Sequence, residues 1–124
     1  MKYLLDTNIV IAACLALDTR LRRHIAKCDE GDLVTSTIVY AEVVFGSVHG
    51  KVPPLDILRA FVRKVPMLDF DTAAAEAYAS LPFRRAKFDR LIAAHALSRG
   101  LVVVTSNEDD FDDIPDLNVE NWIK

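Results

Sequence analysis

The chain has 124 residues, of which 52% are hydrophobic and 27% charged, a composition typical of one folded globular domain rather than a disordered segment. Its net charge of −3, from 15 basic and 18 acidic residues, is not that of a strongly basic nucleic-acid-binding domain. The longest apolar run, residues 9–17, is about half of what a bilayer requires, and Asp6 interrupts the only apolar stretch near the start, so we expect neither a membrane span nor a signal peptide.

The first half of the chain has the pattern of short strands separated by helices. Residues 2–5 are apolar and favour a strand, and Asp6 or Thr7 can cap a helix that begins near Asn8. Further along, the pattern predicts a helix over 18–28, a strand over 33–35, a helix from Ser36 or Thr37 to about Ser47, and a helix over 55–64.

The second half continues this alternation. The pattern predicts a strand over 66–70, a helix over 72–80 capped by Asp71, and a helix over 87–99 that Gly100 closes. The most apolar strand covers 101–104, a polar turn covers 106–111, and a last strand lies near 118–119. Strands that alternate with helices predict an α/β fold in one domain, residues 1–124: a three-layer arrangement with a central, mainly parallel sheet of four to five strands flanked by helices.

Four carboxylates are candidates for a site, because ligands of open α/β sheets bind at the carboxyl ends of the strands. Asp6 follows the first strand, and Asp110 lies in the turn "TSNEDDF" after the strand over 101–104. Glu42 stands among apolar neighbours in "IVYAEVVFG", where a carboxylate is costly unless it faces water, a partner or a metal. Asp89 stands in "FDRLIAAHAL", in the first turn of its helix.

Three of these residues also have a purely structural interpretation. Asp6 can be a helix cap, Glu42 can face solvent, and Asp89 can complement the helix dipole. Ala93 and Ala96 share the face of Asp89 and are small, so this helix can approach the sheet closely. We expect Phe111 to anchor the turn and leave Asp110 pointing toward the site.

Other chemistry-bearing residues are assigned structural roles. We expect His95 to be a core or interface histidine, although a catalytic base is the alternative. Asp71 is assigned to capping, and the acids of the proline turn to the surface: Asp112, Asp113 and Asp116. Cys14 and Cys28 are too few for a disulfide framework or a zinc site, so we expect free buried thiols in a reducing cytoplasm.

Three or four oxygen ligands without a histidine or thiolate cluster favour a hard cation, Mg²⁺ or Mn²⁺. Such an ion serves phosphate chemistry by activating a water and neutralising developing charge. Two phosphotransfer classes share an aspartate at a strand end but fit less well. A receiver domain needs an acidic pair after its first strand, and a haloacid-dehalogenase-like site needs a second aspartate where Asn8 stands.

Taken together, "LLDTN", "AEVVFG", "FDRLIAAHAL" and "VVTSNEDDF", followed by "IPDLNVENW", resemble the PIN-domain family, and within it the VapC-type toxins, over essentially the whole chain. The resemblance implies a metal-dependent ribonuclease with a central parallel sheet. It implies that the acidic quartet, Asp6, Glu42, Asp89 and Asp110, holds Mg²⁺ or Mn²⁺, mainly through Asp6 and Asp89, with Asp110 bound directly or through a water. It implies further that neighbouring polar residues orient these carboxylates by hydrogen bonds: Thr7, Asn8, Thr105 and Asn107.

The family resemblance also implies partners. Such toxins form homodimers and are blocked by a small VapB-type antitoxin, and the apolar side chains Val43, Val44, Phe45, Leu58 and Phe61 are candidates for such contacts. The segment "LPFRRAKFD" departs from the family in carrying a basic cluster, which either holds RNA phosphates or is a solvated loop: Arg84, Arg85, Lys87 and Arg90. A catalytically silent PIN fold that only binds protein is the remaining alternative.

Overall fold

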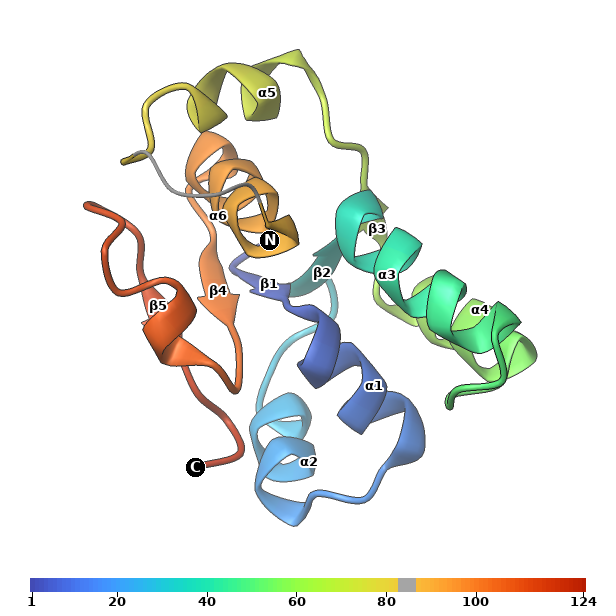
Figure 1. Ribbon diagram of the computed structural model, residues 1–124. Coiled ribbons are helices and arrows are strands. Elements are labelled where there is room, and N and C mark those ends of the chain that lie inside the picture. The colour runs from blue at the N-terminus through green and yellow to red at the C-terminus, as the bar shows by residue number, and fades with distance from the viewer. Residues whose placement is uncertain (83–86) are drawn as a thin grey trace.

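The computed structural model describes residues 1–82 and 87–124. In these residues five strands form one sheet in the order β3-β2-β1-β4-β5, and every neighbouring pair is parallel. The strands are β1 (Tyr3–Leu5), β2 (Leu33–Ser36), β3 (Met67–Leu68), β4 (Val102–Val104) and β5 (Val119–Glu120). The sheet lies at the centre with helices around it (Figure 1), so the predicted α/β fold is confirmed.

Six α-helices and one 3-10 turn connect these strands in the described part of the chain. They are α1 (Thr7–Leu15), α2 (Thr19–Ala26), α3 (Thr37–Val48), α4 (Leu55–Lys64), α5 (Thr72–Tyr78), α6 (Phe88–Arg99) and η1 (Glu108–Asp110). Side-chain caps begin most of the α-helices, because an aspartate or serine before the first turn accepts a backbone N–H: Asp6, Asp18, Ser36 and Asp71. The predicted capping role of Asp71 is therefore confirmed.

The core forms where the central strands meet the buried faces of the helices. Leu4 and Leu5 of β1 and Val103 and Val104 of β4 are fully buried. A fully buried strand needs helices on both faces, which explains why these strands are continuous apolar runs rather than alternating ones. The functional consequence is that polar side chains emerge where the strands end.

Helix α6 packs closely through small residues, as its sequence predicts. Ala93 and Ala96 are fully buried in the core. His95 is also fully buried, its Nδ1 lies 2.8 Å from Ser36 Oγ, and its ring packs edge-on against Phe70. His95 is thus a core histidine, as expected, and burial lowers its pKa.

Both cysteines are free thiols, as predicted, but they are partly rather than fully buried. Burial still raises the pKa of Cys14 to about 11, so this thiol stays protonated near neutral pH. Among the described residues, no helix is both long enough and apolar enough to cross a membrane.

Candidate active site

The first element of the site is the pair of residues that follow the two central strands. The register pairs Leu5 of β1 with Val104 of β4, so Asp6 and Thr105 come next on neighbouring parallel strands. Both are buried, and Thr105 Oγ1 donates to Asp6 Oδ2 over 2.8 Å. Asp6 Oδ1 accepts the backbone N–H of Thr7 over 2.7 Å. Asp6 therefore caps α1 and also presents a fixed carboxylate at the edge of the sheet. The helix-cap role and a role in the site are thus compatible.

Glu42 reaches the same place from α3. The Thr7 hydroxyl donates to Glu42 Oε1 over 2.8 Å, and the carboxylate is half-buried. Burial raises the pKa of Glu42, and the charge of Asp6 raises it further, while the Thr7 hydrogen bond opposes both. Thr7 thus links the first and second acids through its backbone and its side chain, as the predicted orienting role requires.

Asp89 and Asp110 complete the acidic group. Asp89 lies in the first turn of α6, and Asp110 ends η1, whose neighbour Phe111 is 1% exposed and anchors the turn as predicted. Burial raises the pKa of Asp89 to about 6, with further contributions from the charges of Asp6, Asp110 and Glu42 and from a hydrogen bond to the Asp110 side chain. The two aspartates therefore contact each other across 21 positions of sequence.

The four carboxylates form one electrostatically coupled group. Burial also raises the pKa of Asp6, and Asp110 contributes to that shift, whereas the hydrogen bonds from Thr105 and Thr7 oppose it. In the part of the chain that the structure describes, no three acidic, histidine or cysteine side chains already close around an ion-sized site. Repelling oxygen donors nevertheless suit a hard divalent cation, because it would neutralise the charges that raise these pKa values.

The two predicted asparagines play smaller roles than the threonines. Asn8 is exposed on α1, and among the described residues its side chain has no hydrogen bond to the four carboxylates. Asn107 is exposed too, but its backbone shapes the turn: its N–H donates to Thr105 Oγ1 over 3.0 Å, and its carbonyl accepts the N–H of Asp110 over 3.1 Å. Asn107 thus connects Thr105 to Asp110 without using its amide.

The predicted basic cluster is divided by the structure. Arg84 and Arg85 lie outside the described residues. Lys87 is exposed just before α6 and remains a candidate for a phosphate contact. Arg90 does not fit that prediction, because it is 3% exposed and its guanidinium donates to Asp113 and to the carbonyl of Pro82.

Asp113 was expected on the surface, and this expectation is wrong. Its side chain is only 20% exposed, and both of its carboxylate oxygens accept from Arg90. The sequence did carry a signal for this ion pair. Arg90 stands in the first turn of a helix whose following residues are mainly apolar, and a guanidinium buried there requires a partner. The sequence could not show which of the three nearby aspartates supplies it.

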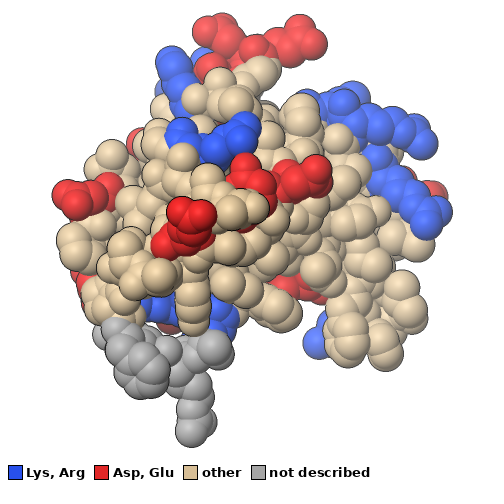
Figure 2. Space-filling view, turned by 90° about the horizontal axis from the view of Figure 1, so that it is seen from above, with Lys and Arg blue, Asp and Glu red and all other residues tan. Residues whose placement is uncertain are grey.

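Charge is mixed on the face of the molecule that Figure 2 shows. In the view of Figure 2, acidic and basic side chains are interspersed with uncharged ones over one face of the molecule. This distribution agrees with the net charge of −3. On this face, any RNA affinity would therefore depend on local contacts near the carboxylates rather than on a broad basic patch.

Comparison with known proteins identifies the family. The PIN-domain model matches residues 3–117. The chain belongs to the PIN-domain family. It is 30% identical to the tRNA(fMet)-specific endonuclease VapC of Shigella flexneri over 98% of both chains. The four candidate carboxylates, Asp6, Glu42, Asp89 and Asp110, lie inside the matched region.

Two solved structures have the same fold over nearly the full length of the chain. One is VapBC2 of Rickettsia felis bound to a fragment of its promoter DNA, with a TM-score of 0.86 and 27% identity over 98% of this chain and 99% of the other. The other is DNA-bound VapBC of Salmonella typhimurium, with a TM-score of 0.85 and 30% identity over 98% of each chain. The family predicted from the sequence motifs, and its VapC branch, are therefore confirmed.

Proposed function

We propose that this PIN domain is a metal-dependent endoribonuclease that acts as the toxin of a toxin–antitoxin pair. The observation that carries the proposal is the convergence of Asp6, Glu42, Asp89 and Asp110 at one edge of the sheet. Burial and neighbouring carboxylates raise the pKa values of the first three. The similarity of this chain to a VapC endonuclease over 98% of both chains supports RNA as the substrate. Transfer RNA is the first substrate to test, since that relative is named for it.

Asp6, Asp89 and Asp110 are the residues that would hold Mg²⁺ or Mn²⁺. When bound, such an ion supplies a positive charge next to the scissile phosphate and lowers the pKa of a coordinated water. Thr105 keeps Asp6 oriented and favours its ionised form, because a hydrogen bond donated to a carboxylate stabilises the charge. A carboxylate serves as a metal ligand in its ionised form, so the hydrogen bond from Thr105 favours metal binding by Asp6.

Glu42 is the candidate for handling the proton of the attacking water. Its pKa is raised by burial and by Asp6, which makes it a better proton acceptor than an ordinary glutamate. The Thr7 hydrogen bond to Oε1 fixes the orientation of the carboxylate and leaves Oε2 available. Glu42 would therefore orient the water and take its proton as the water attacks the phosphorus in line. The P–O bond opposite the incoming oxygen breaks in the same step, and the leaving oxygen takes up a proton from solvent.

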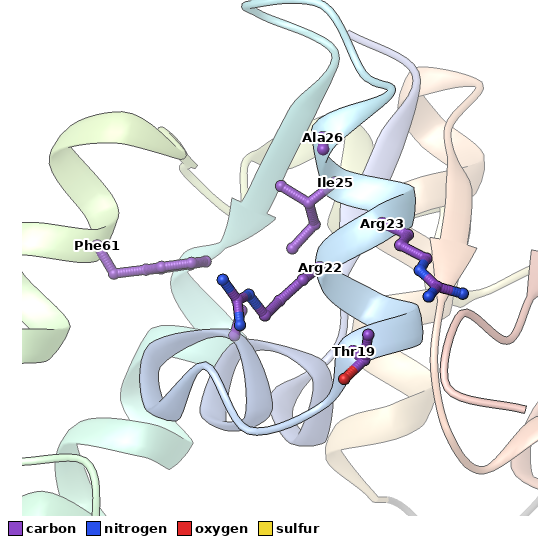
Figure 3. Close-up of a pocket in the computed structure, with 7 residues that line it drawn as sticks. Thr19, Arg22, Arg23, Ile25, Ala26 and Phe61 are labelled. Atoms are coloured by element: carbon purple, nitrogen blue, oxygen red, sulfur yellow. The ribbon is translucent and has the colours of Figure 1, made fainter.

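We propose further that a VapB-type antitoxin occupies a groove between α2 and α4. Its volume is about 640 Å³, and Figure 3 shows Arg22 and Ile25 of α2 pointing toward Phe61 of α4 across it. The groove is lined by Ala13, Thr19, Arg22, Arg23, Ile25, Ala26 and Phe61. Apolar walls bordered by arginines suit an amphipathic segment with acidic residues. The structures similar to this chain include VapBC complexes, which supports a protein occupant.

A second copy of the chain is the partner we propose for another apolar surface. Phe45, Val48 and Phe88 are 67%, 66% and 51% exposed, values that are high for large apolar side chains on neighbouring helices. Of the five side chains predicted to form contacts, Val43 and Leu58 lie in the core instead, Val44 and Phe61 are partly buried, and Phe45 is exposed. The dimer surface is thus assigned to the outer face of α3 around Phe45.

The proposed activity is tested by incubating purified, antitoxin-free protein with total tRNA in Mn²⁺, in Mg²⁺ or in EDTA. We expect cleavage only with metal, and at least a hundredfold loss in Asp6→Asn and Asp89→Asn, since ligand carboxylates act as a unit. Asp71→Asn is the matched control, because Asp71 caps α5 instead. Folded protein that binds Mn²⁺ but cleaves no RNA would indicate a silent binding module and contradict the proposal.

A further inference from the structure

Arg90 occupies an unusual position beside the acidic group. It follows Asp89 directly in the first turn of α6, yet its side chain is only 4% exposed. Its Nη1 donates to both carboxylate oxygens of Asp113, over 2.9 and 3.1 Å, and its Nη2 donates to the carbonyl of Pro82 over 2.7 Å. A guanidinium with these three hydrogen bonds is held in one orientation.

Asp113, the ion-pair partner of Arg90, belongs to the segment that carries Asp110. It lies three residues after Asp110, in the segment that follows η1. Phe111 and Ile114 are 1% and 5% exposed, so the core holds this segment on both sides of Asp113. The Arg90–Asp113 pair therefore joins the start of α6, which carries Asp89, to the turn that carries Asp110.

This connection opposes a repulsion within the site. Asp89 at the start of α6 and Asp110 at the end of η1 carry like charges at the same edge of the sheet, so their ionised carboxylates repel each other and push the two segments apart. Two other ion pairs of the described residues, Arg99–Asp71 at 3.8 Å and Lys124–Glu108 at 3.7 Å, are longer and involve more exposed side chains. Arg90–Asp113 is thus the shortest and most buried of the three.

We propose that Arg90 and Asp113 are positioning residues that hold Asp89 and Asp110 within reach of one metal ion. The proposal rests on the proposed function and adds to it the pair that preorganises two of the ligands. Arg90 itself touches neither the metal nor the RNA. Arg90 acts on two residues of the site. One is Asp89, which precedes it in the chain, and the other is Asp110, which lies three residues before its ion-pair partner Asp113.

The test compares Mn²⁺ binding by calorimetry in the wild type and in variants that keep the protein folded. Arg90→Met with Asp113→Leu replaces the pair by apolar side chains of similar size, which buried ion pairs often tolerate without loss of stability. Arg90→Lys keeps the charge but cannot reach Asp113 and Pro82 together. Arg99→Met, at the far end of the same helix, is the matched control.

We expect the double variant to bind Mn²⁺ about 10-fold to 100-fold more weakly, as is typical when a group that orients a metal ligand is removed. Arg90→Lys should lie between it and the wild type, and Arg99→Met should match the wild type. In cleavage assays at limiting Mn²⁺ the rate constant should fall while KM for RNA stays unchanged. If the double variant does not fold, Arg90→Lys decides by the same measurement.

Two results would overturn the proposal while the wild type binds Mn²⁺. One is wild-type Mn²⁺ affinity in the folded double variant, or in Arg90→Lys where the double variant is unfolded. The other is a raised KM for RNA with unchanged Mn²⁺ affinity, which would make Arg90 an RNA contact after all. A wild type that binds no Mn²⁺ would instead contradict the proposed function itself, so the two failures are distinguishable.

Discussion

Two buried threonines near the end of β1 make the same kind of hydrogen bond to different acceptors. Thr105 donates to the carboxylate of Asp6 over 2.8 Å, and Thr35 donates to the backbone carbonyl of Leu5 over 2.9 Å. Replacement by valine keeps the shape and leaves a buried acceptor without its donor. We expect both Thr105→Val and Thr35→Val to lower the free energy of unfolding by about 1–3 kcal/mol.

Only Thr105→Val should change the pH dependence of cleavage. Its hydrogen bond lowers the pKa of Asp6, so without it the carboxylate stays protonated to higher pH. We expect the acidic limb of the pH–rate profile to move upward by about one pH unit, since one unit corresponds to about 1.4 kcal/mol. Equal shifts in the Thr35→Val profile would show that stability, not the charge of Asp6, controls the effect.

The ionised carboxylate of Asp89 destabilises the folded protein, and its proposed role as a metal ligand explains why such a residue is present. Its pKa is raised from 3.8 to about 6, so between these values the folded chain keeps a proton that the unfolded chain has released. Stability therefore falls as pH rises through this window, and the full cost is present above it. In EDTA we expect Asp89→Asn to have a higher Tm than the wild type at about pH 8 and an equal Tm at about pH 3.5.

Thermal unfolding followed by circular dichroism at both pH values checks this prediction. Saturating Mn²⁺ should reverse the order at about pH 8, because an ion that binds only the folded wild type stabilises it. Asp109→Asn is the matched control, since Asp109 is an exposed neighbour of Asp110. A lower Tm for Asp89→Asn in EDTA at about pH 8 would contradict the assigned cost.

At the scale of elements, α6 controls the distance between Asp89 and the sheet. Ala93 is fully buried one turn after Asp89. Ala93→Leu adds three carbons to a packed contact, and we expect a loss of about 1–3 kcal/mol from overpacking. In protein that remains folded, the displaced helix should also bind Mn²⁺ more weakly. Ala75→Leu on the exposed face of α5 should change neither quantity, and a similar loss there would contradict the packing argument.

The elements themselves were largely predictable, and their boundaries were set by local chemistry. Helix α4 spans 55–64 as predicted, because its apolar period and the preceding prolines are features of the sequence alone. Strands β1, β3 and β4 are one to three residues shorter than predicted, because the hydrogen bonds between strands end where a neighbouring strand ends, whereas β2 is one residue longer. Strand order and register are set by contacts between distant segments, so the sequence could place Asp6 at a strand end but not beside Thr105.

The grouping of the candidate carboxylates could be expected from the sequence, whereas the hydrogen bonds and ion pairs around them could not. Two of the four carboxylates could be selected because they follow strands, and one because it interrupts an apolar helix. Asp89 could be selected because the small residues on its helix face let that helix approach the sheet. The partner of Arg90 lies 23 positions away, and nothing local separates Asp113 from Asp112 or Asp116. Burial decides among them, and burial depends on how the segment after η1 folds against α6. Residues that orient other residues are for this reason harder to find from sequence than the ligands.

At the scale of the whole molecule, the exposed apolar face of α3 adjoins the acidic site. A hollow of about 430 Å³ is lined by Ala41, Glu42, Phe45 and Phe88, so a second copy packed around Phe45 would border the edge that carries Glu42. We expect Phe45→Asp to abolish the proposed dimer and leave a monomer in sedimentation experiments. The Tm of the monomer should change little beyond the loss of association, because Phe45 is 67% exposed and outside the core.

Leu17→Asp supplies the matched control for this surface. Leu17 is 80% exposed in the loop after α1, so it tests the effect of replacing an exposed apolar side chain with a charge elsewhere. We expect Leu17→Asp to remain dimeric, since an isolated exposed leucine is ordinary whereas a contiguous apolar patch marks an interface. A Phe45→Asp protein that sediments as the wild type would exclude the α3 face as the dimer surface. It would leave that hollow, with Glu42 in its wall, open to the RNA or the antitoxin instead.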